Sequence, residues 1–375
     1  MADTGWIRWT NTTDIFGDFT NDTNIISPNT GETFSNGATT DTITLLSLSS
    51  LSIPTGARIT GIAYKFRAKK TSDTPNLKTQ LSLTSGFTKA SDINTETLTD
   101  SYVDYEVGGD GNILGFKQTL ISDTDDPAAG GFGIESLILK FTTEGTGIVY
   151  IEGTSESPAV KIFYEPVPDG TSVSDWVRFT TLDSSDGWYD SSDTNLASPN
   201  EGNATWLNPL TNPYFIGSGF DFGVPSNATI TGIEYRTVIQ ANLFGLSTNQ
   251  VWNGKLSTDS FLEGDITDEF FTIASTDYDT LLTVYQTGSF EDTFGLTLTG
   301  NNVNDLKLGF LLSQTGGGVA VAGSILGEQG DGTTVYFPTP SIRVFYTTPE
   351  PTPSPSLEPK FAVRSSGFYV RESSF

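Results

Sequence analysis

The most constraining feature of this sequence is a stretch that occurs twice. Residues 53–64 read IPTGARITGIAY, and residues 224–235 read VPSNATITGIEY. In each copy a branched apolar residue precedes Pro, a polar turn follows, and the copy ends in β-branched and aromatic residues, which predicts a turn leading into a β-strand. Gly61 and Gly232 are interpreted as points of bending or close backbone approach rather than as parts of a ligand site.

Further blocks repeat in the same order on either side of this stretch. They are residues 6–10 (WIRWT) and 176–180 (WVRFT), 22–29 (DTNIISPN) and 193–200 (DTNLASPN), and 158–164 (PAVKIFY) and 340–346 (PSIRVFY). A repeat with a period of about 170 residues indicates a duplicated domain rather than a solenoid. We therefore expect one domain at residues 1–165, a second at 166–348, and a separate segment at 349–375.

The segments between these blocks have the pattern of short β-strands. The expected strands are residues 42–48, 77–83, 102–107 and 147–151 in the first copy, and 233–239, 282–285, 294–298 and 306–312 in the second. The opening blocks, 6–10 and 176–180, alternate in the same way, and no amphipathic helix of three turns is evident. The sequence predicts an all-β fold: two tandem antiparallel β-sandwich domains, jelly-roll-like, followed by an extended Pro-rich C-terminal segment with a short β-hairpin.

The C-terminal segment combines a spacer with a candidate anchor. Residues 349–359 are rich in Pro and predict an extended polyproline-type spacer. Residues 361–372 alternate apolar and polar side chains around a Ser-Ser-Gly turn, and an isolated hairpin is only marginally stable in water. We expect it to dock on a partner through Phe361, Val363, Arg364, Phe368, Tyr369, Val370 and Arg371.

Composition excludes several classes of function. The chain of 375 residues has 45 Asp and Glu against 19 Lys and Arg, a formal charge of −26, which opposes binding to nucleic acid and to anionic membranes. The chain contains neither Cys nor His, so disulfides, thiolate metal sites and imidazole acid-base chemistry are excluded. We see no secretory signal and no apolar run of about 20 residues, and expect a soluble protein.

Catalysis would have to rely on carboxylates alone. The acidic candidates in expected loops are Asp123, Asp125, Asp126, Glu135, Asp183, Asp186, Asp190, Glu263 and Asp265. Such residues in an acidic chain are more often simply solvated, so we expect no enzymatic activity and no cofactor. We assign no metal site; the weak candidates for a structural Ca²⁺ are Asp183, Asp186 and Asp190, which cluster in one expected loop.

Aromatic residues in expected loops of the second copy offer a binding alternative. Trp188, Tyr189, Trp206 and Trp252, with Tyr214 nearby, could form a platform that contacts a glycan. Such residues also commonly pack the ends of a sandwich or a contact between subunits.

The order of motifs resembles β-sandwich virion proteins of tailed bacteriophages. The resemblance covers residues 6–346 and rests on Ile-Thr-Gly-Ile at 59–62 and 230–233, on Leu-Gly-Phe at 114–116 and Phe-Gly-Leu at 294–296, and on the closing strands at 160–164 and 342–346. It implies a non-enzymatic component (fibre, tail or capsid-decoration protein) displayed on the virion surface and made in the host cytoplasm. Its partners would be other virion proteins and copies of itself, with a carbohydrate-binding adhesin for a host-surface glycan as the alternative.

Overall fold

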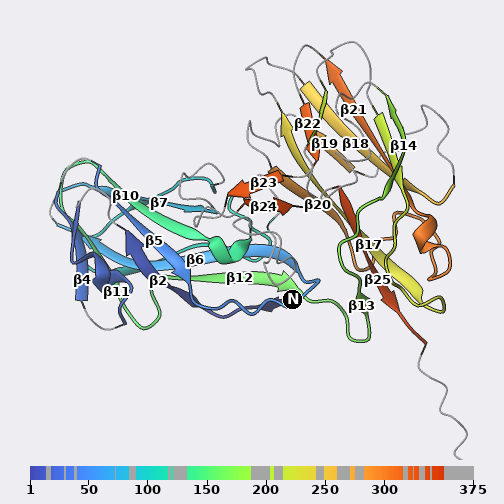
Figure 1. The fold of residues 1–375 in the computed structure, drawn as a ribbon. Coiled ribbons are helices and arrows are strands. Elements are labelled where there is room, and N and C mark those ends of the chain that lie inside the picture. Colours follow the sequence, from blue (N-terminus) through green and yellow to red (C-terminus); the bar gives the residue numbers. More distant parts are fainter. Residues whose placement is uncertain are drawn as a thin grey trace, which may run out of the picture.

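The computed structural model is built almost entirely from β-strands, which confirms the predicted fold class (Figure 1). It describes residues 1–13, 18–28, 31–37, 40–71, 73–83, 90–116, 120, 133–186, 203–206, 214–241, 249–259, 271–274, 283–315, 320–323, 325–328, 334–337 and 340–349. Helical structure in these ranges is limited to the short 3₁₀ turns η1 (Asp22–Ile25), η3 (Ile134–Ser136) and η4 (Val303–Asp305). Within the same ranges, no helix has the length and apolar character needed to cross a membrane.

The first half, residues 1–165, forms two antiparallel layers joined by one strand. Its strands are β1 (Ala2–Asp3), β2 (Ile7–Thr13), β3 (Phe19–Thr20), β4 (Gly31–Ser35), β5 (Thr42–Leu48), β6 (Arg58–Lys70), β7 (Asn76–Ser82), β8 (Asn94–Thr97), β9 (Val103–Gly109), β10 (Ile138–Glu144), β11 (Val149–Gly153) and β12 (Ala159–Glu165). In one layer β6 pairs with β9 along one edge and with β11 and β12 along the other; in the second layer β10 lies between β5 and β7. Strand β2 pairs first with β12 and then with β5, so it passes from one layer to the other.

The second half, residues 166–349, repeats the central pairings of the first. Its strands are β13 (Ser172–Val173), β14 (Thr181–Asp186), β15 (Asn203–Trp206), β16 (Tyr214–Ser218), β17 (Thr229–Ala241), β18 (Asn249–Ser257), β19 (Phe271–Ala274), β20 (Thr283–Ser289), β21 (Lys307–Thr315), β22 (Ala320–Gly323), β23 (Ile325–Glu328), β24 (Thr334–Phe337) and β25 (Ser341–Thr347). Strand β17 takes the place of β6 and pairs with β20, β22 and β25. Strand β21 takes the place of β10, between β16 and β18. The hairpin β23–β24 has no counterpart among the described strands of the first half.

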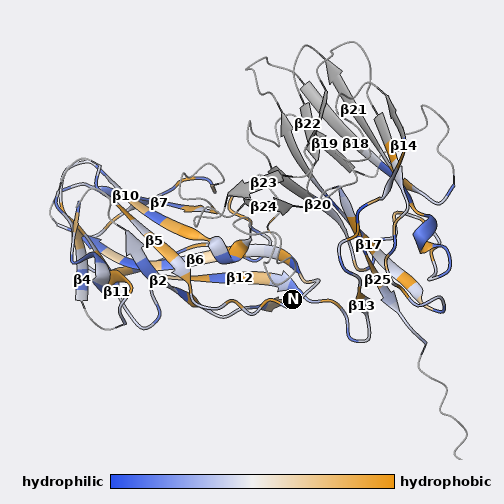
Figure 2. Cartoon of the chain, viewed as in Figure 1, coloured by the Kyte–Doolittle hydropathy of each residue, from blue (hydrophilic) through white to orange (hydrophobic). Residues whose placement is uncertain are grey.

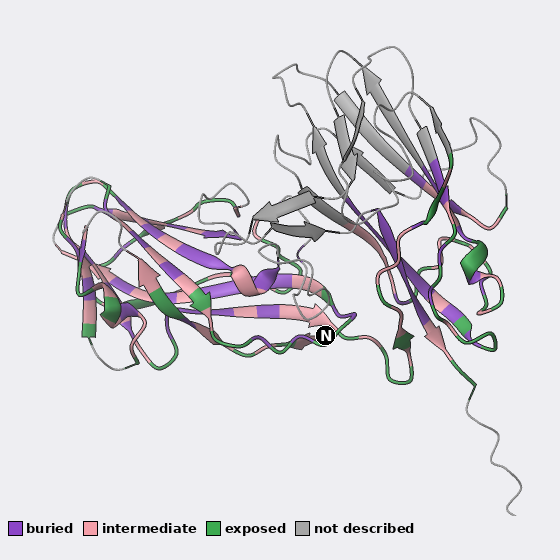
Figure 3. Cartoon of the chain, viewed as in Figure 1, coloured by how far each residue is buried: buried purple, intermediate pink, exposed green. Residues whose placement is uncertain are grey.

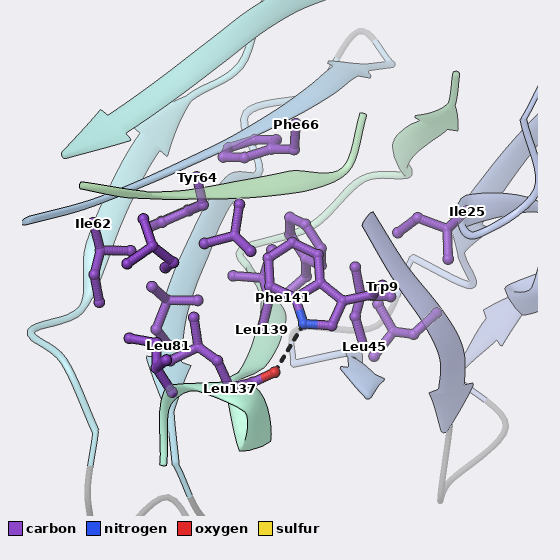
Figure 4. Packing of buried hydrophobic residues seen from close by; sticks show 14 of the residues in the cluster. Trp9, Ile25, Leu45, Ile62, Tyr64, Phe66, Leu81, Leu137, Leu139 and Phe141 are labelled. Atoms are coloured by element: carbon purple, nitrogen blue, oxygen red, sulfur yellow. Dashed lines mark hydrogen bonds between the residues drawn. The ribbon is translucent and has the colours of Figure 1, made fainter. Parts of the chain in front are cut away.

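The core of the first half lies between its layers and follows from the period-two pattern of the strands. Along β6, Ile62, Tyr64 and Phe66 are at most 1% exposed and point inward. Phe66 meets Phe141 of β10 edge to face, with ring centres 5.3 Å apart. Trp9 is buried beside them and donates a hydrogen bond from Nε1 to the Leu137 carbonyl at 2.9 Å (Figure 4). Figure 2 shows the same alternation of apolar and polar residues along the strands.

The duplicated stretch builds the same local structure in both halves. The Ala57 amide donates to the Pro54 carbonyl at 3.1 Å, and Ala228 does the same to Pro225 at 2.9 Å. Each following strand then contains a β-bulge against the closing strand of its half. A Cβ on Gly61 or Gly232 would collide with the backbone of the neighbouring turn, so these glycines are points of close backbone approach, as predicted.

Most of the predicted strands are present, but two segments are not strands. Residues 42–48 form β5, and 77–83 and 306–312 overlap β7 and β21. Residues 294–298 instead begin with a tight turn, because Phe294 and Gly295 have φ of 51° and 73° and Asp292 Oδ1 accepts the Phe294 amide at 2.7 Å. Residues 176–180 pass between the two sheets of the second half with only a bridge at Val177, whereas β2 makes the same passage as a continuous strand.

The predicted Pro-rich spacer and terminal hairpin lie almost wholly outside the described residues, which end at Pro349.

Candidate binding surface

Strand β6 places a row of cations on the outer face of the first half. Its side chains alternate, so Lys65, Arg67 and Lys69 point outward, whereas Tyr64, Phe66 and Ala68 are buried. Three of the chain's 19 Lys and Arg therefore lie in one row on this face.

Two lysines of this face lie on Trp6. The Lys65 Nζ is 4.5 Å from the Trp6 ring centre, and the Lys161 Nζ on the neighbouring strand β12 is 4.6 Å from it. Lys161 also lies 5.8 Å from the ring centre of Phe163. We call Trp6, Lys65, Lys161 and Phe163 the first cation–aromatic cluster. Each such contact is worth about 0.5–1 kcal/mol at an exposed site.

The row continues beyond this cluster along β6. Lys69 Nζ lies 4.3 Å from the ring centre of Tyr102 and 4.8 Å from that of Tyr150. Arg67 Nε donates to the Glu152 carboxylate at 2.6 Å. Both partners of this ion pair are partly exposed, so its contribution to stability is small.

The second half has the same cluster at the corresponding positions. The guanidinium carbons of Arg236 and Arg343 lie 3.9 and 4.6 Å from the ring centre of Trp176, and that of Arg343 lies 5.3 Å from the ring centre of Phe345. We call Trp176, Arg236, Arg343 and Phe345 the second cation–aromatic cluster.

Burial separates the two clusters. Arg236, Arg343 and Phe345 are at most 1% exposed, whereas the Lys65 side chain is 17% exposed and Phe163 is half-buried. Figure 3 shows the two halves coloured by burial. Arg343 is accompanied by Glu234, whose carboxylate accepts Arg343 Nε at 2.5 Å and is itself 1% exposed. Buried charge of this kind is tolerated when it is paired and hydrogen-bonded.

The turn around Gly56 in the first half contacts Phe345 of the second cluster. A Cβ placed on Gly56 would lie 2.8 Å from Val167, 3.0 Å from Val173 and 3.4 Å from Phe345. Gly56 has φ of 81°, so the turn before β6 presents bare backbone to these side chains. The linker between β12 and β13, residues 166–171, takes part in this contact through Val167. It contains a turn in which the Thr171 amide donates to the Pro168 carbonyl at 3.1 Å.

A cavity of about 540 Å³ remains beside this contact, lined by both halves. The first half contributes Ala57, Arg58, Ile59, Thr60, Ile113, Phe116 and Leu120; the second contributes Glu234, Gln286, Thr287, Gly288, Ser289 and Asp292. Its lining combines hydroxyl, amide and charged groups with a small apolar wall, and it could hold a polar ligand.

Many of the residues expected to be functional lie outside the described residues. This holds for the anchor residues Phe361, Val363, Arg364, Phe368, Tyr369, Val370 and Arg371, for Trp188, Tyr189 and Asp190, and for Asp123, Asp125, Asp126, Glu263 and Asp265. Glu135 lies in the short turn η3.

The expected loop positions of three aromatic residues are wrong. Trp206 lies in β15 opposite Ala320, Tyr214 lies in β16 opposite Leu311, and Trp252 lies in β18 between Ile273 and Leu312. Strand pairing decides their place. A glycan platform made from loop residues cannot include these three.

Of the three calcium candidates, Asp183 and Asp186 lie in β14, and Asp190 lies outside the described residues. Asp183 accepts a hydrogen bond from Ser218 Oγ at 2.8 Å and lies 3.3 Å from Lys307 Nζ, so its carboxylate already faces a cation. The backbone of Asp186 pairs with Tyr214 at the end of β14. In the described part of the chain, no group of three or more acidic residues is arranged to hold a metal ion.

The cation–aromatic clusters were missed from the sequence, although a signal for them exists. Their members come from segments far apart, and only the strand pairing brings Trp6 beside Lys65 and Lys161. The signal is that both copies carry a cation at positions 65 and 161 and at their repeats, 236 and 343.

Comparison with known proteins identifies no family. No protein-family model and no curated protein matches the chain. Among solved structures, the chain is similar to the N-terminal CBM22-1–CBM22-2 tandem domain of Xyn10C from Paenibacillus barcinonensis, with 11% identity over 92% of this chain and 98% of that one and a TM-score of 0.24. It is also similar to the glycoside hydrolase domain of Endo-D from Streptococcus pneumoniae R6, with 10% identity over 76% of this chain and 33% of that one and a TM-score of 0.19. Neither likeness bears on function.

Proposed function

We propose that this chain is a non-enzymatic structural component displayed on the surface of a tailed-phage particle, attached through its C-terminal segment and by self-association. The observation that carries the proposal is the kind of residue that the duplication has kept. Both halves repeat the bulge, the glycine at the close approach, the tight turn and the cation–aromatic cluster.

What differs between the halves also supports a structural role. Ala63 in the first half corresponds to Glu234 in the second, and Lys65 and Lys161 correspond to Arg236 and Arg343. These changes follow burial: the buried cluster has guanidinium groups with a buried carboxylate partner, and the half-buried cluster has lysines, one of them paired with the exposed Glu156. Such substitutions adapt one framework to two packing environments, which is what a protein selected for shape requires.

The experiment is attachment to particles that lack this chain. The full chain should sediment with the particles, and a chain ending at Thr348 should stay in the supernatant, because residues 349–375 carry the proposed anchor. A full-length variant, Arg364→Glu with Arg371→Glu, should lose attachment with an unchanged circular dichroism spectrum. If both variants still sediment with the particles, the anchor is wrong. Hydrolysis of any polysaccharide in a panel would contradict a non-enzymatic role.

Glycan binding is the second candidate function, and the polar cavity between the halves favours it. Thr60, Thr287 and Ser289 line that cavity beside Phe116, which is the mixture of hydroxyl groups and an apolar wall that suits a sugar. A glycan array probed with the full chain tests this proposal. Loss of binding in Thr287→Val, with Trp188→Ala as the comparison, would separate the cavity from the expected loop platform. If the full chain binds no glycan on the array, this candidate function is wrong.

A further inference from the structure

Strand β9 forms an open edge of the first half. It pairs with β6 along one side, and no described strand pairs with its other side. Val103 at its start is 39% exposed, and Gly108 near its end is also exposed. An edge of this kind presents a row of backbone N–H and C=O groups to which a further strand can add.

The two faces of β9 differ in character. Tyr105 and Val107 pack against the core of the first half. Asp104 and Glu106 are exposed on the outer face, where Asp104 pairs with Arg67 at 3.0 Å. A strand that suits this edge is therefore apolar on its inner face and carries cations on its outer face.

A hollow of about 280 Å³ lies beside the inner face of β9. It is lined by Val107 of β9, by Leu114 in the turn that follows, and by Ile93 just before β8, the outermost strand of the second layer. Ile93 is 58% exposed, which is unusual for a large apolar side chain of this molecule. The space between the edges of the two layers can therefore accept an apolar side chain from an added strand.

The expected terminal hairpin has the two faces that this edge requires. A two-residue turn at Ser366-Gly367 places the four large apolar side chains on one face, namely Phe361, Val363, Phe368 and Val370. It places the arginines and the tyrosine on the other, namely Arg364, Tyr369 and Arg371. Residues 360–372 carry three cations and one carboxylate in a chain of net charge −26, so their charge is opposite to that of the edge.

The spacer is long enough for this segment to reach β9 of its own molecule. Phe345, near the end of β25, lies against Gly56, which precedes β6. The chain from Gly56 to Gly61 spans at most about 18 Å, and Gly61 lies against Gly109 at the end of β9. Residues 348–360 span about 40 Å in the polyproline conformation, which covers a path of this length.

From these observations we infer that residues 361–364 add as an antiparallel strand to β9 of the same molecule, with the apolar face over the hollow and the arginines beside Asp104 and Glu106. Strand β9 runs toward the contact between the halves, so a strand that arrives from there runs the opposite way. The inference rests on the proposed anchor and deepens it, because residues 368–372 then form the new edge that meets the particle.

The matching edge of the second half lacks the two carboxylates. Strand β20 is that edge, since it pairs with β17 and with no other described strand. By register, Val284 and Gln286 stand at the positions of Asp104 and Glu106. Gln286 lines the cavity between the two halves. The second edge therefore provides a matched control for the first.

The absence of native cysteine makes the contact testable by crosslinking within one chain. Under mild oxidation, Arg364→Cys combined with Asp104→Cys or Glu106→Cys should form an internal disulfide whose yield does not depend on protein concentration. The better of the two yields should be several-fold above that of Arg364→Cys with Gln286→Cys, although Gln286 belongs to the half that carries the spacer. Equal yields overturn the inference. Disulfide-linked dimers in place of the internal bond also overturn it, because the segment of another copy is then the occupant.

An exchange of charges tests the pairing without cysteine. In the parent chain, the amides of residues 361–364 should exchange hydrogen several-fold more slowly than those of the spacer. Asp104→Lys with Glu106→Lys should remove this protection, and adding Arg364→Glu with Arg371→Glu should restore it. Protection that is absent from the parent chain, or that survives the two lysines, overturns the inference. Both assays use purified chains without particles, so their failure leaves the proposed attachment to be decided by sedimentation.

Discussion

The two cation–aromatic clusters are the same construction in two environments. In the first half, Lys65 and Lys161 lie against Trp6 on a half-buried face. In the second half, the fully buried Arg236 and Arg343 lie against Trp176. A lysine at the surface keeps its ammonium group hydrated while its stem packs, whereas a buried cation requires a fixed partner. The comparison teaches that one position of a shared fold takes lysine where it is partly exposed and arginine with a buried carboxylate where it is buried.

The largest effect should come from removing the partner of the buried cation. Glu234→Ala leaves Arg343 buried without its carboxylate, and we expect a loss of about 3–5 kcal/mol in the free energy of unfolding of the second half. Urea unfolding read by hydrogen exchange of peptides from each half measures it. The matched change in the first half, Glu156→Ala, removes the exposed partner of Lys65 and should have no resolvable effect. Equal effects of the two changes would contradict the contrast between the clusters.

A smaller effect, equal in the two halves, should come from filling the close approaches. Gly61→Ala and Gly232→Ala each place a methyl group against backbone atoms of the adjoining turn, which should cost about 1–3 kcal/mol in the half that carries it. Thermal melting of each variant, with the neighbouring Thr60→Ala as control, checks this. If only one of the two variants lost stability, the two close approaches would not be equivalent, and the prediction would be wrong.

The smallest effect is a pH dependence of the first half. Burial raises the pKa of the Tyr64 hydroxyl to about 12, while its hydrogen bond with Thr79 Oγ1 at 2.6 Å acts in the opposite direction. An unfolded tyrosine titrates near pH 10, so the stabilising contribution is complete below pH 10 and is lost as the pH rises toward 12. Tyr64→Phe should cost about 1 kcal/mol at neutral pH and flatten the decline between pH 10 and 12 in urea titrations. An unchanged alkaline slope would show that another group governs it.

The sequence predicted the framework better than the surface. Period-two alternation and the duplicated turn identified β5, β7 and the role of Gly61, because these depend on local pattern. Residues 294–298 were predicted as a strand, but the turn there is set by two positive-φ residues that hydrophobicity does not report. The clusters depend on the pairing of strands that are distant in sequence, so no single stretch could predict them.

The same limit explains the expected binding residues. Trp206 and Trp252 are expected in loops, yet each lies in a paired strand. Asp183 belongs to a run of acidic residues, but the fold brings Lys307 beside it from a different strand. The composition shows which types of residue are available for binding. Which side chains lie next to one another depends on the pairing of the strands, which the composition does not show.

The most direct test of this account is hydroxyl-radical footprinting of the two matched rings. Phe163, which is half-buried, should be oxidised several-fold faster than Phe345, which is fully buried. Equal rates for the two rings would contradict the account.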